Sequence, residues 1–384
     1  MIEQRSAVEA RLRRTYGFDE VALVPGAVTL DPSEVDLSVE IAGVDLRIPF
    51  LAAAMDAVSD PSFATLMRRA GGLAFVNLEG LYTRYDDPHP IIERVTAAES
   101  ADAAHAVLAD AYAAPVRSDL VDRIIRRLKA DGGIAAVATT PANAWEHAEL
   151  AAEAGADLFL VQSQVSSARH ISTTGRVLNL SDLTGALKLP VLVGNTVSGD
   201  AAHQLMEQGA AGILVGVGPG AACTTREVLG IGVPQVSATI EVAAARDRFF
   251  AETGRYVPVV TDGGMRTGGD IAKAIASGAD AVMLGSPLAA AVEAPGRGFS
   301  WGMAAPSATL PRGTRIRIGN RMPLEQILFG PAQTSHGTQN LTGALRQSMA
   351  ALGARTVREM HQVEMVVAPS IAVEGKSWQL AGSE

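Results

Sequence analysis

The stretch VLVGNTVSGDAAHQLMEQGAAGILVG, residues 191–216, contains two apolar runs with a helical pattern between them. The first run, Val191–Asn195, and the second, Gly212–Gly216, have the length and composition of buried strands. The helical pattern Asp200–Gln208 stops before Gly209, a residue type that suits the left-handed turn at a helix end. This succession predicts two parallel strands joined by a right-handed crossover.

The same unit recurs along the chain. Three helical patterns end in a glycine phrase, at Ala154-Gly155-Ala156-Asp157, Gln208-Gly209-Ala210-Ala211 and Ser277-Gly278-Ala279-Asp280. The predicted strands are Ile48–Ala54, Leu73–Asn77, Ile134–Thr139, Asp157–Gln162, Val191–Asn195, Gly212–Gly216, Val257–Thr261 and Ala281–Gly285. The predicted helices between them are Asp60–Ala70, Asp119–Ala130, Pro141–Ala154, Asp200–Gln208, Ser237–Thr253 and Gly268–Ala276. Such units close most simply into an α/β fold of the (β/α)8 or TIM-barrel type, and a doubly wound open sheet is the alternative.

The composition fits one α/β domain. Of 384 residues, 48% are hydrophobic and 19% charged, and we predict a single catalytic domain over residues 1–384. The net charge of −9 and the lack of a Lys/Arg run argue against a nucleic-acid partner. One cysteine excludes an internal disulfide framework. No apolar run of about 18 residues and no signal-peptide pattern occurs, so we expect a cytoplasmic protein with no membrane partner.

Three stretches lie outside the repeat. Residues 1–46 precede the first predicted strand. Residues 78–130 contain two helix-like segments, of which the first, Ala97–Ala114, is rich in alanine. Residues 286–336 are rich in Gly, Pro, Ser and Arg and precede a final helix at Leu341–Leu352. Because this last stretch follows the eighth strand at the C-terminal face of a barrel, we predict that it forms an active-site flap.

The single cysteine follows a glycine-rich turn after the sixth predicted strand. Gly218 and Gly220 allow backbone groups to converge on an ion or a phosphate, and Cys223 comes directly after them. A reactive thiol needs a loop that exposes it and surroundings that favour the thiolate. Cys223 is therefore the predicted nucleophile, and a buried structural cysteine is the alternative.

The next two strand ends carry residue types that suit a sugar phosphate. Asp262 precedes Gly263 and Gly264, so a carboxylate for sugar hydroxyls stands before backbone N–H groups that can hold a phosphate. Gly285 and Ser286 follow the last strand, and phosphate sites after the last two strands recur in TIM barrels. These residues predict a phosphorylated small molecule as substrate, with an ordinary Asp-Gly turn as the alternative.

Polar residues after two further strands are candidates for ligand contacts. Gln162 and Ser163 stand at the end of the fourth predicted strand, and Asn195 stands at the end of the fifth. Each of them either donates to a ligand or closes a turn, and the residues alone do not decide between these roles.

Several motifs occur in one order along the chain. They are FDEVALVP at 18–25, Met55-Asp56, Gly194-Asn195, the Cys223 loop through Pro234-Gln235, Asp262-Gly263-Gly264, Leu284-Gly285-Ser286, Glu293-Ala294-Pro295-Gly296, Gly302-Met303 and LTGALRQSM at 341–349. Through these motifs the chain resembles the IMP dehydrogenase/GMP reductase family over nearly its whole length. It is most similar to a short branch, related to IMP dehydrogenase, that lacks the regulatory pair of CBS modules.

The resemblance implies NAD-dependent oxidation of IMP to XMP in guanine nucleotide biosynthesis. Cys223 would attack C2 of the hypoxanthine, hydride would pass to NAD⁺, and water would hydrolyse the resulting thioimidate. Thr225 matches the threonine that assists proton transfer in the family. The Arg-Tyr pair that activates water in relatives is missing, and we hypothesise that Arg312 acts as the base or contacts the purine.

The resemblance also implies which residues contact each ligand. Substrate contacts are implied for Met55, Asp262, Gly264, Gly285, Ser286, Gly302 and Met303. Cofactor contacts are implied at Gln162, Ser163 and Asn195, with Gln162 in place of the family's aspartate. A K⁺ site is implied at Gly218, Gly220 and Cys223, with Glu374 supplied by a neighbouring subunit. The C-terminal segment 360–384 is therefore expected at a subunit interface of a homotetramer or an octamer.

Two other functions remain open from the sequence. A GMP reductase would share the cysteine and use NADPH, although Glu227 is typical of the dehydrogenases where reductases tend to carry lysine. A purine-nucleotide-binding regulator without turnover is the second alternative. Retention of Cys223 with both following threonines argues against that regulator, because a sensor needs no thiol.

Overall fold

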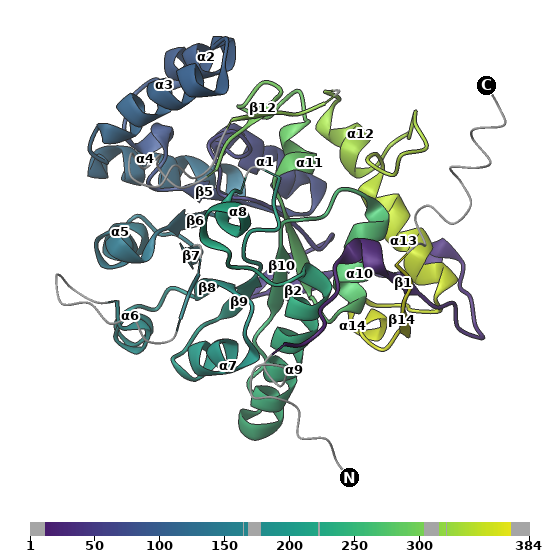
Figure 1. Ribbon diagram of the computed structural model, residues 1–384. Coiled ribbons are helices and arrows are strands. Elements are labelled where there is room, and N and C mark those ends of the chain that lie inside the picture. The colour runs from purple at the N-terminus through teal and green to yellow at the C-terminus, as the bar shows by residue number, and fades with distance from the viewer. Residues whose placement is uncertain are drawn as a thin grey trace.

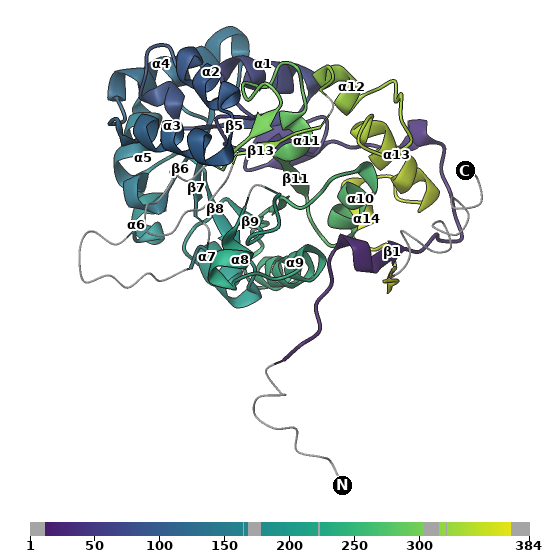
Figure 2. The same cartoon turned by 45° about the horizontal axis from the view of Figure 1, so that its top comes forward.

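A computed structural model describes residues 12–163, 165–167, 178–221, 223–302, 315–319 and 321–369. At its centre, eight parallel strands close into a barrel surrounded by helices (Figure 1, Figure 2). The barrel strands are β4 (Phe50–Ala52), β5 (Leu73–Asn77), β6 (Ala136–Thr139), β7 (Leu158–Gln162), β8 (Val191–Thr196), β9 (Gly212–Val215), β10 (Val259–Asp262) and β11 (Ala281–Leu284). Since β11 pairs with β4 and completes the ring, the predicted TIM barrel is confirmed and the open sheet is excluded.

The structure contains the six predicted barrel helices to within a few residues, and it adds two short ones, at Leu180–Ala186 and Thr225–Leu229, that the sequence analysis does not predict. The outer helices are α1 (Pro61–Ala70), α4 (Ser118–Lys129), α5 (Ala144–Glu153), α6 (Leu180–Ala186), α7 (Gly199–Glu207), α8 (Thr225–Leu229), α9 (Gln235–Thr253) and α10 (Gly268–Ala276). The glycines of the three repeated phrases, Gly155, Gly209 and Gly278, have φ of 85°, 95° and 104°. Each stands where the left-handed conformation turns the chain from a helix into the next strand, which is the role the sequence predicts.

The interior of the barrel is a packed apolar core. Its members alternate along the strands and include Phe75, Leu160, Leu214 and Met283. A hairpin of β2 (Val39–Ile41) and β3 (Val44–Leu46) packs against this core at the N-terminal ends of the strands. With that end closed, the carboxyl ends of the strands form the mouth at which polar side chains are displayed.

The segment between β5 and β6 contains three α-helices rather than the two predicted. They are α2 (His89–Ala97), α3 (Ala101–Ala113) and α4. The predicted alanine-rich helix is interrupted at Ser100, whose side chain accepts a hydrogen bond from the amide of Ala103 and so begins α3. The helices α2 and α3 lie outside the ring of barrel helices (Figure 1).

The chain after β11 returns along the mouth of the barrel and then along its side. It forms α11 (Ser286–Ala289), β12 (Phe299–Ser300), β13 (Ile316–Arg317), α12 (Leu324–Leu328), α13 (Leu341–Ala351), α14 (Val357–Met360) and β14 (Met365–Val367). Helix α13 confirms the predicted final helix. Strand β14 pairs antiparallel with β1 (Val21–Leu23) of the same chain, so the start of the expected interface segment is tied to the N-terminal region.

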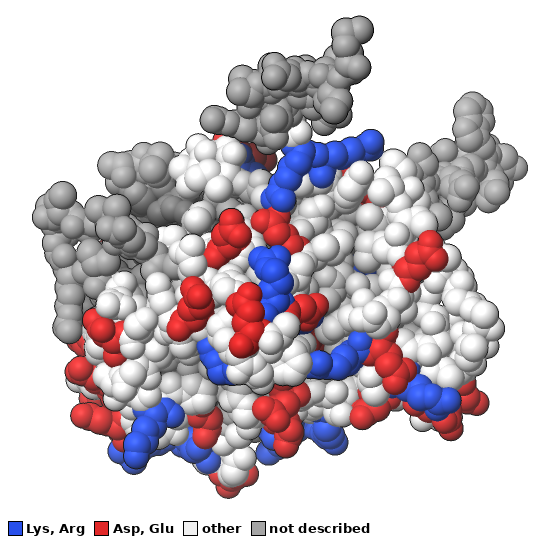
Figure 3. All heavy atoms as spheres, turned by 90° about the horizontal axis from the view of Figure 1, so that it is seen from below, with Lys and Arg blue, Asp and Glu red and all other residues white. Residues whose placement is uncertain are grey.

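The surface mixes both signs of charge. On the face seen in Figure 3, acidic and basic side chains are interspersed rather than gathered by sign. In the part of the chain that the structure describes, no helix has the length and apolar character needed to cross a membrane.

Candidate active site

The candidate nucleophile lies at the mouth of the barrel, on the loop between β9 and α8. The Cys223 side chain is exposed, and its amide donates to the carbonyl of Gly220 at 3.0 Å, which closes the turn. The Cys223 sulfur lies 3.1 Å from Oγ1 of Thr225, the buried first residue of α8. The predicted pair of thiol and hydroxyl is therefore in hydrogen-bond contact.

Arg226 fixes the shape of this loop from below. Its Nε donates to the carbonyl of Val217 at 3.1 Å, and its Nη2 donates to the carbonyl of Val233 at 2.8 Å. Gly218 has φ of 71°, and a Cβ there would lie 2.7 Å from Cγ of Arg226. Partial burial lowers the pKa of Arg226, while its interaction with Cys223 acts in the opposite direction. Arg226 therefore holds the glycine-rich turn against the segment that leads into α9.

Three side chains from strands far apart in the sequence meet beside the thiol loop. The Oδ2 of Asp262 accepts from Nδ2 of Asn195 at 2.7 Å and from Nε2 of Gln162 at 2.9 Å. The same Nε2 also donates to Oδ1 of Asn195 at 2.9 Å. Burial raises the pKa of Asp262 to about 6, and the two amide donors oppose that shift. The network leaves the second carboxylate oxygen of Asp262 to accept from a ligand.

The residues that the resemblance assigns to separate ligands thus share one network. Gln162 and Asn195 are implied as cofactor contacts, and Asp262 is implied as a substrate contact. Because both N–H groups of the Gln162 amide are used, its carbonyl oxygen is the group left to meet a ligand. Ser163 extends the network, since its amide donates to Gly194 at 2.8 Å and its hydroxyl lies 3.0 Å from that of Ser166.

The thiol loop packs directly on the loop after β10. A Cβ at Gly263 would lie 3.3 Å from Cγ of Pro219, and one at Gly264 would lie 3.0 Å from Cβ of the same proline. Both glycines have positive φ, of 81° and 80°. A side chain at either position would strain the backbone and push the two loops apart. The loop that carries Cys223 and the loop that follows Asp262 are therefore held in contact.

Gln235, the first residue of α9, ties the two loops together at their roots. Its Nε2 donates to the carbonyl of Val215 at 2.8 Å and to the carbonyl of Asp262 at 2.9 Å. The side chain is 3% exposed. One buried amide thus fixes the end of β9, which leads to the thiol, against the end of β10.

We expect Gln235→Met to destabilise the fold by about 2–4 kcal/mol, because it leaves two buried carbonyls unpaired without changing side-chain length. Gln235→Glu is expected to cost more, since a carboxylate would face both carbonyl oxygens. Urea unfolding measures both effects. Gln204→Glu, which changes the same side chain on the exposed face of α7, serves as control. Equal unfolding free energies for Gln235→Glu and Gln204→Glu would contradict this role.

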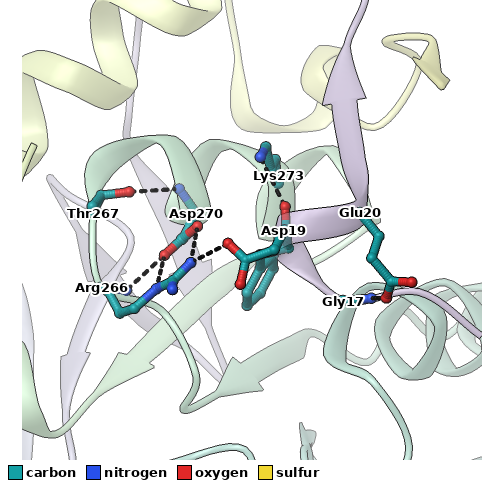
Figure 4. Close-up of polar contacts among 8 residues, drawn as sticks. Gly17, Asp19, Glu20, Arg266, Thr267, Asp270 and Lys273 are labelled. Carbon is teal, nitrogen blue, oxygen red and sulfur yellow. Dashed lines mark hydrogen bonds and ion pairs between the residues drawn. The ribbon is translucent and has the colours of Figure 1, made fainter. Parts of the chain in front are cut away.

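The N-terminal segment braces the loop after β10 from outside. Figure 4 shows the Arg266 guanidinium between two carboxylates, with Nη2 at 2.6 Å from Oδ1 of Asp19 and Nε at 3.0 Å from Oδ2 of Asp270. Lys273 donates from Nζ to the carbonyl of Phe18 at 2.8 Å. These contacts fasten the 18–25 motif to α10, directly after the glycines of the candidate phosphate loop.

The remaining predicted residues divide into two groups. Gly285 and Ser286 follow β11, and the sulfur of Met55 lies 3.4 Å from where a Cβ of Gly285 would stand. Gly302 lies shortly after β12, within the predicted flap region 286–336. The residues Met303, Arg312 and Glu374 lie outside the described part of the chain.

The donor atoms in the described region fit some of the implied ligands. Backbone carbonyls around Gly218 and Gly220 are hard oxygen donors of the kind a monovalent cation prefers. The described residues contain no group of three or more His, Cys, Asp or Glu side chains arranged to hold a metal ion.

Sequence reasoning assigns no role to Arg226 or to Gln235, although Gln235 ends the motif that begins with the Cys223 loop. Arg226 gives a local signal, because a cation three residues after a candidate thiol in the first turn of a helix lies near that thiol. Gln235 gives none, since its partners Val215 and Asp262 belong to two strands that meet only in the closed barrel.

Comparisons with known proteins agree with this arrangement. Residues 15–304 match the sequence model of the IMP dehydrogenase / GMP reductase domain. An uncharacterized oxidoreductase of Mycolicibacterium smegmatis is 39% identical over 363 residues, which cover 92% of this chain and 97% of that protein. Inosine-5'-monophosphate dehydrogenase of Cryptosporidium parvum is 32% identical over 286 residues, which cover 73% of this chain and 69% of that enzyme.

A solved structure is similar over most of the chain. The crystal structure of an IMP dehydrogenase/GMP reductase-like protein from Corynebacterium glutamicum has a TM-score of 0.88 and 37% sequence identity. The match covers 93% of this chain and 95% of that one.

Proposed function

Because the chain belongs to the IMP dehydrogenase/GMP reductase family, as an oxidoreductase, we propose that it oxidises IMP to XMP with NAD⁺ through a covalent intermediate on Cys223. The observation that carries this proposal is the exposed thiol of Cys223 in contact with Thr225, on a loop packed against the glycines that follow Asp262. A nucleophile, a hydroxyl and a candidate sugar-phosphate loop thus converge at one mouth of the barrel.

The proposed chemistry divides one oxidation into two easier steps. The Cys223 thiolate adds to C2 of the hypoxanthine ring, which forms a C–S bond and moves an electron pair onto the ring nitrogen. C2 then loses a hydride, so the base is oxidised by two electrons. NAD⁺, when bound, supplies the acceptor for that hydride. Water attacks C2, the C–S bond breaks, a proton is released, and XMP leaves with the thiolate restored.

Two neighbours prepare the thiol for the first step. Arg226 holds a guanidinium beneath the loop, where it interacts electrostatically with Cys223. The Thr225 hydroxyl, 3.1 Å from the sulfur, donates to the thiolate and is placed to relay a proton when water replaces sulfur on C2. Arg312 is the proposed group that activates this water.

The substrate would lie across the carboxyl ends of the last three strands. Asp262 would accept from the ribose hydroxyls with its second carboxylate oxygen, and Gly264, Gly285 and Ser286 would hold the phosphate. Met55 would contact the nucleotide beside Gly285. Gly302 and Met303 would contact the base.

The cofactor would lie toward β7 and β8, and the cation would lie in the thiol loop. Gln162, Ser163 and Asn195 would meet the cofactor. Gly218, Gly220 and Cys223 would hold K⁺ with their carbonyls, together with Glu374 from a neighbouring subunit of a homotetramer.

The test is the formation of NADH, followed at 340 nm, when the purified protein is mixed with IMP, NAD⁺ and potassium. Turnover supports the proposal, and replacement of potassium by sodium measures the cation requirement. No signal with IMP, followed by oxidation of NADPH with GMP, would replace the dehydrogenase with a reductase. If neither NADH formation with IMP nor NADPH oxidation with GMP is detected, and calorimetry shows tight IMP binding, a nucleotide-binding regulator would be favoured.

A further inference from the structure

Asp56, the residue directly after Met55, is a buried carboxylate with no role in the chemistry above. It is 2% exposed, and its Oδ2 accepts from the amide of Leu81 at 2.8 Å and from the hydroxyl of Tyr112 at 2.6 Å. Its other oxygen lies against Gly80, where a Cβ would overlap with it. Burial raises the pKa of Asp56 to about 6, and the two hydrogen bonds oppose that shift.

Tyr112 reaches Asp56 from outside the barrel repeat. It lies near the end of α3, in the helical segment between β5 and β6, and packs in one apolar cluster with Ala57 and Trp301. The Arg84 guanidinium lies 5.8 Å from the Tyr112 ring centroid. Its positive charge also lowers the pKa of Asp56. Tyr112, on α3, therefore contacts the loop after β4 through its hydrogen bond to Asp56. It also shares an apolar cluster with Trp301, which follows β12.

The same helical segment also contacts β12 and β13, two short strands within the predicted flap region 286–336. Nη1 of Arg315 donates to the carbonyl of Val95 at the end of α2, at 2.7 Å, and its guanidinium lies 4.4 Å from the ring centroid of Phe299. Helices α2 and α3 accordingly lie beside β12 and β13 (Figure 2). The helical segment thus contacts the barrel mouth at two places, through Tyr112 to Asp56 and through Val95 to Arg315. The contact at Asp56 is the one that involves a buried carboxylate.

The position of Met55 depends on that carboxylate. The amides of Val58 and Ser59 donate to the carbonyl of Met55 at 2.8 and 2.9 Å, which makes this loop one tight turn. The Met55 side chain leaves the turn toward Gly285, and the next side chain, Asp56, leaves it toward Tyr112. A shift of the carboxylate therefore rotates the turn that presents Met55.

Removal of the Tyr112 hydroxyl would leave the charge poorly compensated. Among the described residues, Tyr112 provides the side-chain hydrogen bond to Asp56, and the amide of Leu81 provides the other bond. A buried carboxylate that loses one of two donors is costly, so it moves to find a new donor or water. An uncharged side chain at position 56 would not carry this cost.

We propose that Tyr112 is a positioning residue for the substrate site, whose hydroxyl holds the Asp56 carboxylate and thereby presents Met55 beside Gly285. Its effect on IMP rests on the proposed function, because Met55 and Gly285 belong to the proposed nucleotide site. Its effect on the turn after β4 does not rest on that function. Helix α3 then acts as a support for the active site.

The test compares Tyr112→Phe with Tyr85→Phe in the full-length chain. The Tyr85 hydroxyl donates to the carbonyl of Ala111 at 2.9 Å, so its removal costs the same helix one hydrogen bond without touching Asp56. We expect Tyr112→Phe to raise KM for IMP about tenfold with kcat changed less than threefold, and Tyr85→Phe to leave both within twofold. Equal KM values for the two variants would overturn the proposal.

Two further measurements separate positioning from general loosening and from the proposed function. In an Asp56→Asn background, Tyr112→Phe is expected to change KM less than threefold, because no buried charge remains to be held; an undiminished tenfold effect would overturn the proposal. Hydrogen exchange without any ligand should show faster exchange of the Val58 and Ser59 amides in Tyr112→Phe than in Tyr85→Phe. If exchange differs but the protein does not oxidise IMP, the positioning role of Tyr112 holds and the proposed dehydrogenase activity is rejected. If exchange does not differ, the positioning role is overturned.

Discussion

Cys223→Ala is expected to lower the rate of NADH formation from IMP by about 10⁴-fold or more, because removal of a catalytic nucleophile leaves only binding and electrostatics to act. The covalent route has no substitute, since Cys223 is the single cysteine of the chain. Calorimetry is expected to give an IMP dissociation constant within about threefold of the parent value, because the groups around Asp262 are untouched.

The control for this experiment is Thr225→Val, which removes the hydroxyl beside the sulfur and keeps the branched shape. We expect this variant to retain an adduct of protein and nucleotide that mass spectrometry detects after a quench with acid, at a turnover reduced by about 10²-fold. The alanine variant should show no adduct. Turnover by Cys223→Ala above about one per cent of the parent rate would remove the covalent mechanism.

Asp262→Asn is expected to weaken IMP binding about 10- to 100-fold at pH 8, because charge-assisted hydrogen bonds to the ribose would become neutral ones. Asn195 and Gln162 already donate to one carboxylate oxygen, so the variant also places an amide where those donors need an acceptor. Calorimetric titration with IMP measures the loss. Binding unchanged by this substitution would show that the nucleotide lies elsewhere.

The pH dependence gives the same residue a second readout. Burial raises the pKa of Asp262 from 3.8 to about 6, so the ionised acceptor is lost as the pH falls through 6. The phosphate of IMP also titrates at about pH 6, so the comparison between the two proteins carries the test: affinity for IMP should drop more between pH 7 and pH 5 in the parent protein than in Asp262→Asn.

The folded state responds to pH in the opposite direction. A raised folded-state pKa contributes stability that is present below the unfolded value and is lost as the pH rises through 6. The parent should gain stability relative to Asp262→Asn on acidification from pH 7 to pH 4. Urea unfolding of both proteins at the two pH values measures the difference, and an opposite trend would contradict the assignment of the buried carboxylate.

The barrel was predictable because its pattern is local and repeated. Each strand is a short apolar run, and each turn from helix to strand contains a glycine whose left-handed conformation the structure confirms at Gly155, Gly209 and Gly278. Helix α2 escaped prediction because it is short and separated from α3 by only three residues. Its two buried apolar side chains, Ile92 and Val95, pack on a cluster formed by tertiary contacts rather than by the barrel repeat.

The sequence suggests candidate site residues one at a time, but it does not suggest the hydrogen-bond network that joins them. The side chains of Gln162 and Asp262 stand 100 positions apart and meet only because β7, β8 and β10 end at one mouth. Tyr112 and Asp56 are 56 positions apart and meet because α3 folds back on the barrel. Sequence patterns identify which residue types stand at strand ends, whereas the closure of the barrel decides which of those side chains form hydrogen bonds with one another.

The single exposed thiol allows the proposed active sites in a sample to be counted by thiol titration. Since every chain carries one cysteine, and since that cysteine is Cys223, one equivalent of a thiol reagent consumed corresponds to one proposed active site. The number of reactive thiols per chain thus measures the fraction of protein with an intact Cys223 before any substrate is added. A single cysteine also has a chemical consequence under oxidation. If Cys223 is oxidised to a sulfenic acid, the chain has no second thiol to condense with it as a disulfide, so further oxidation to the irreversible sulfinic acid is not blocked from within the chain.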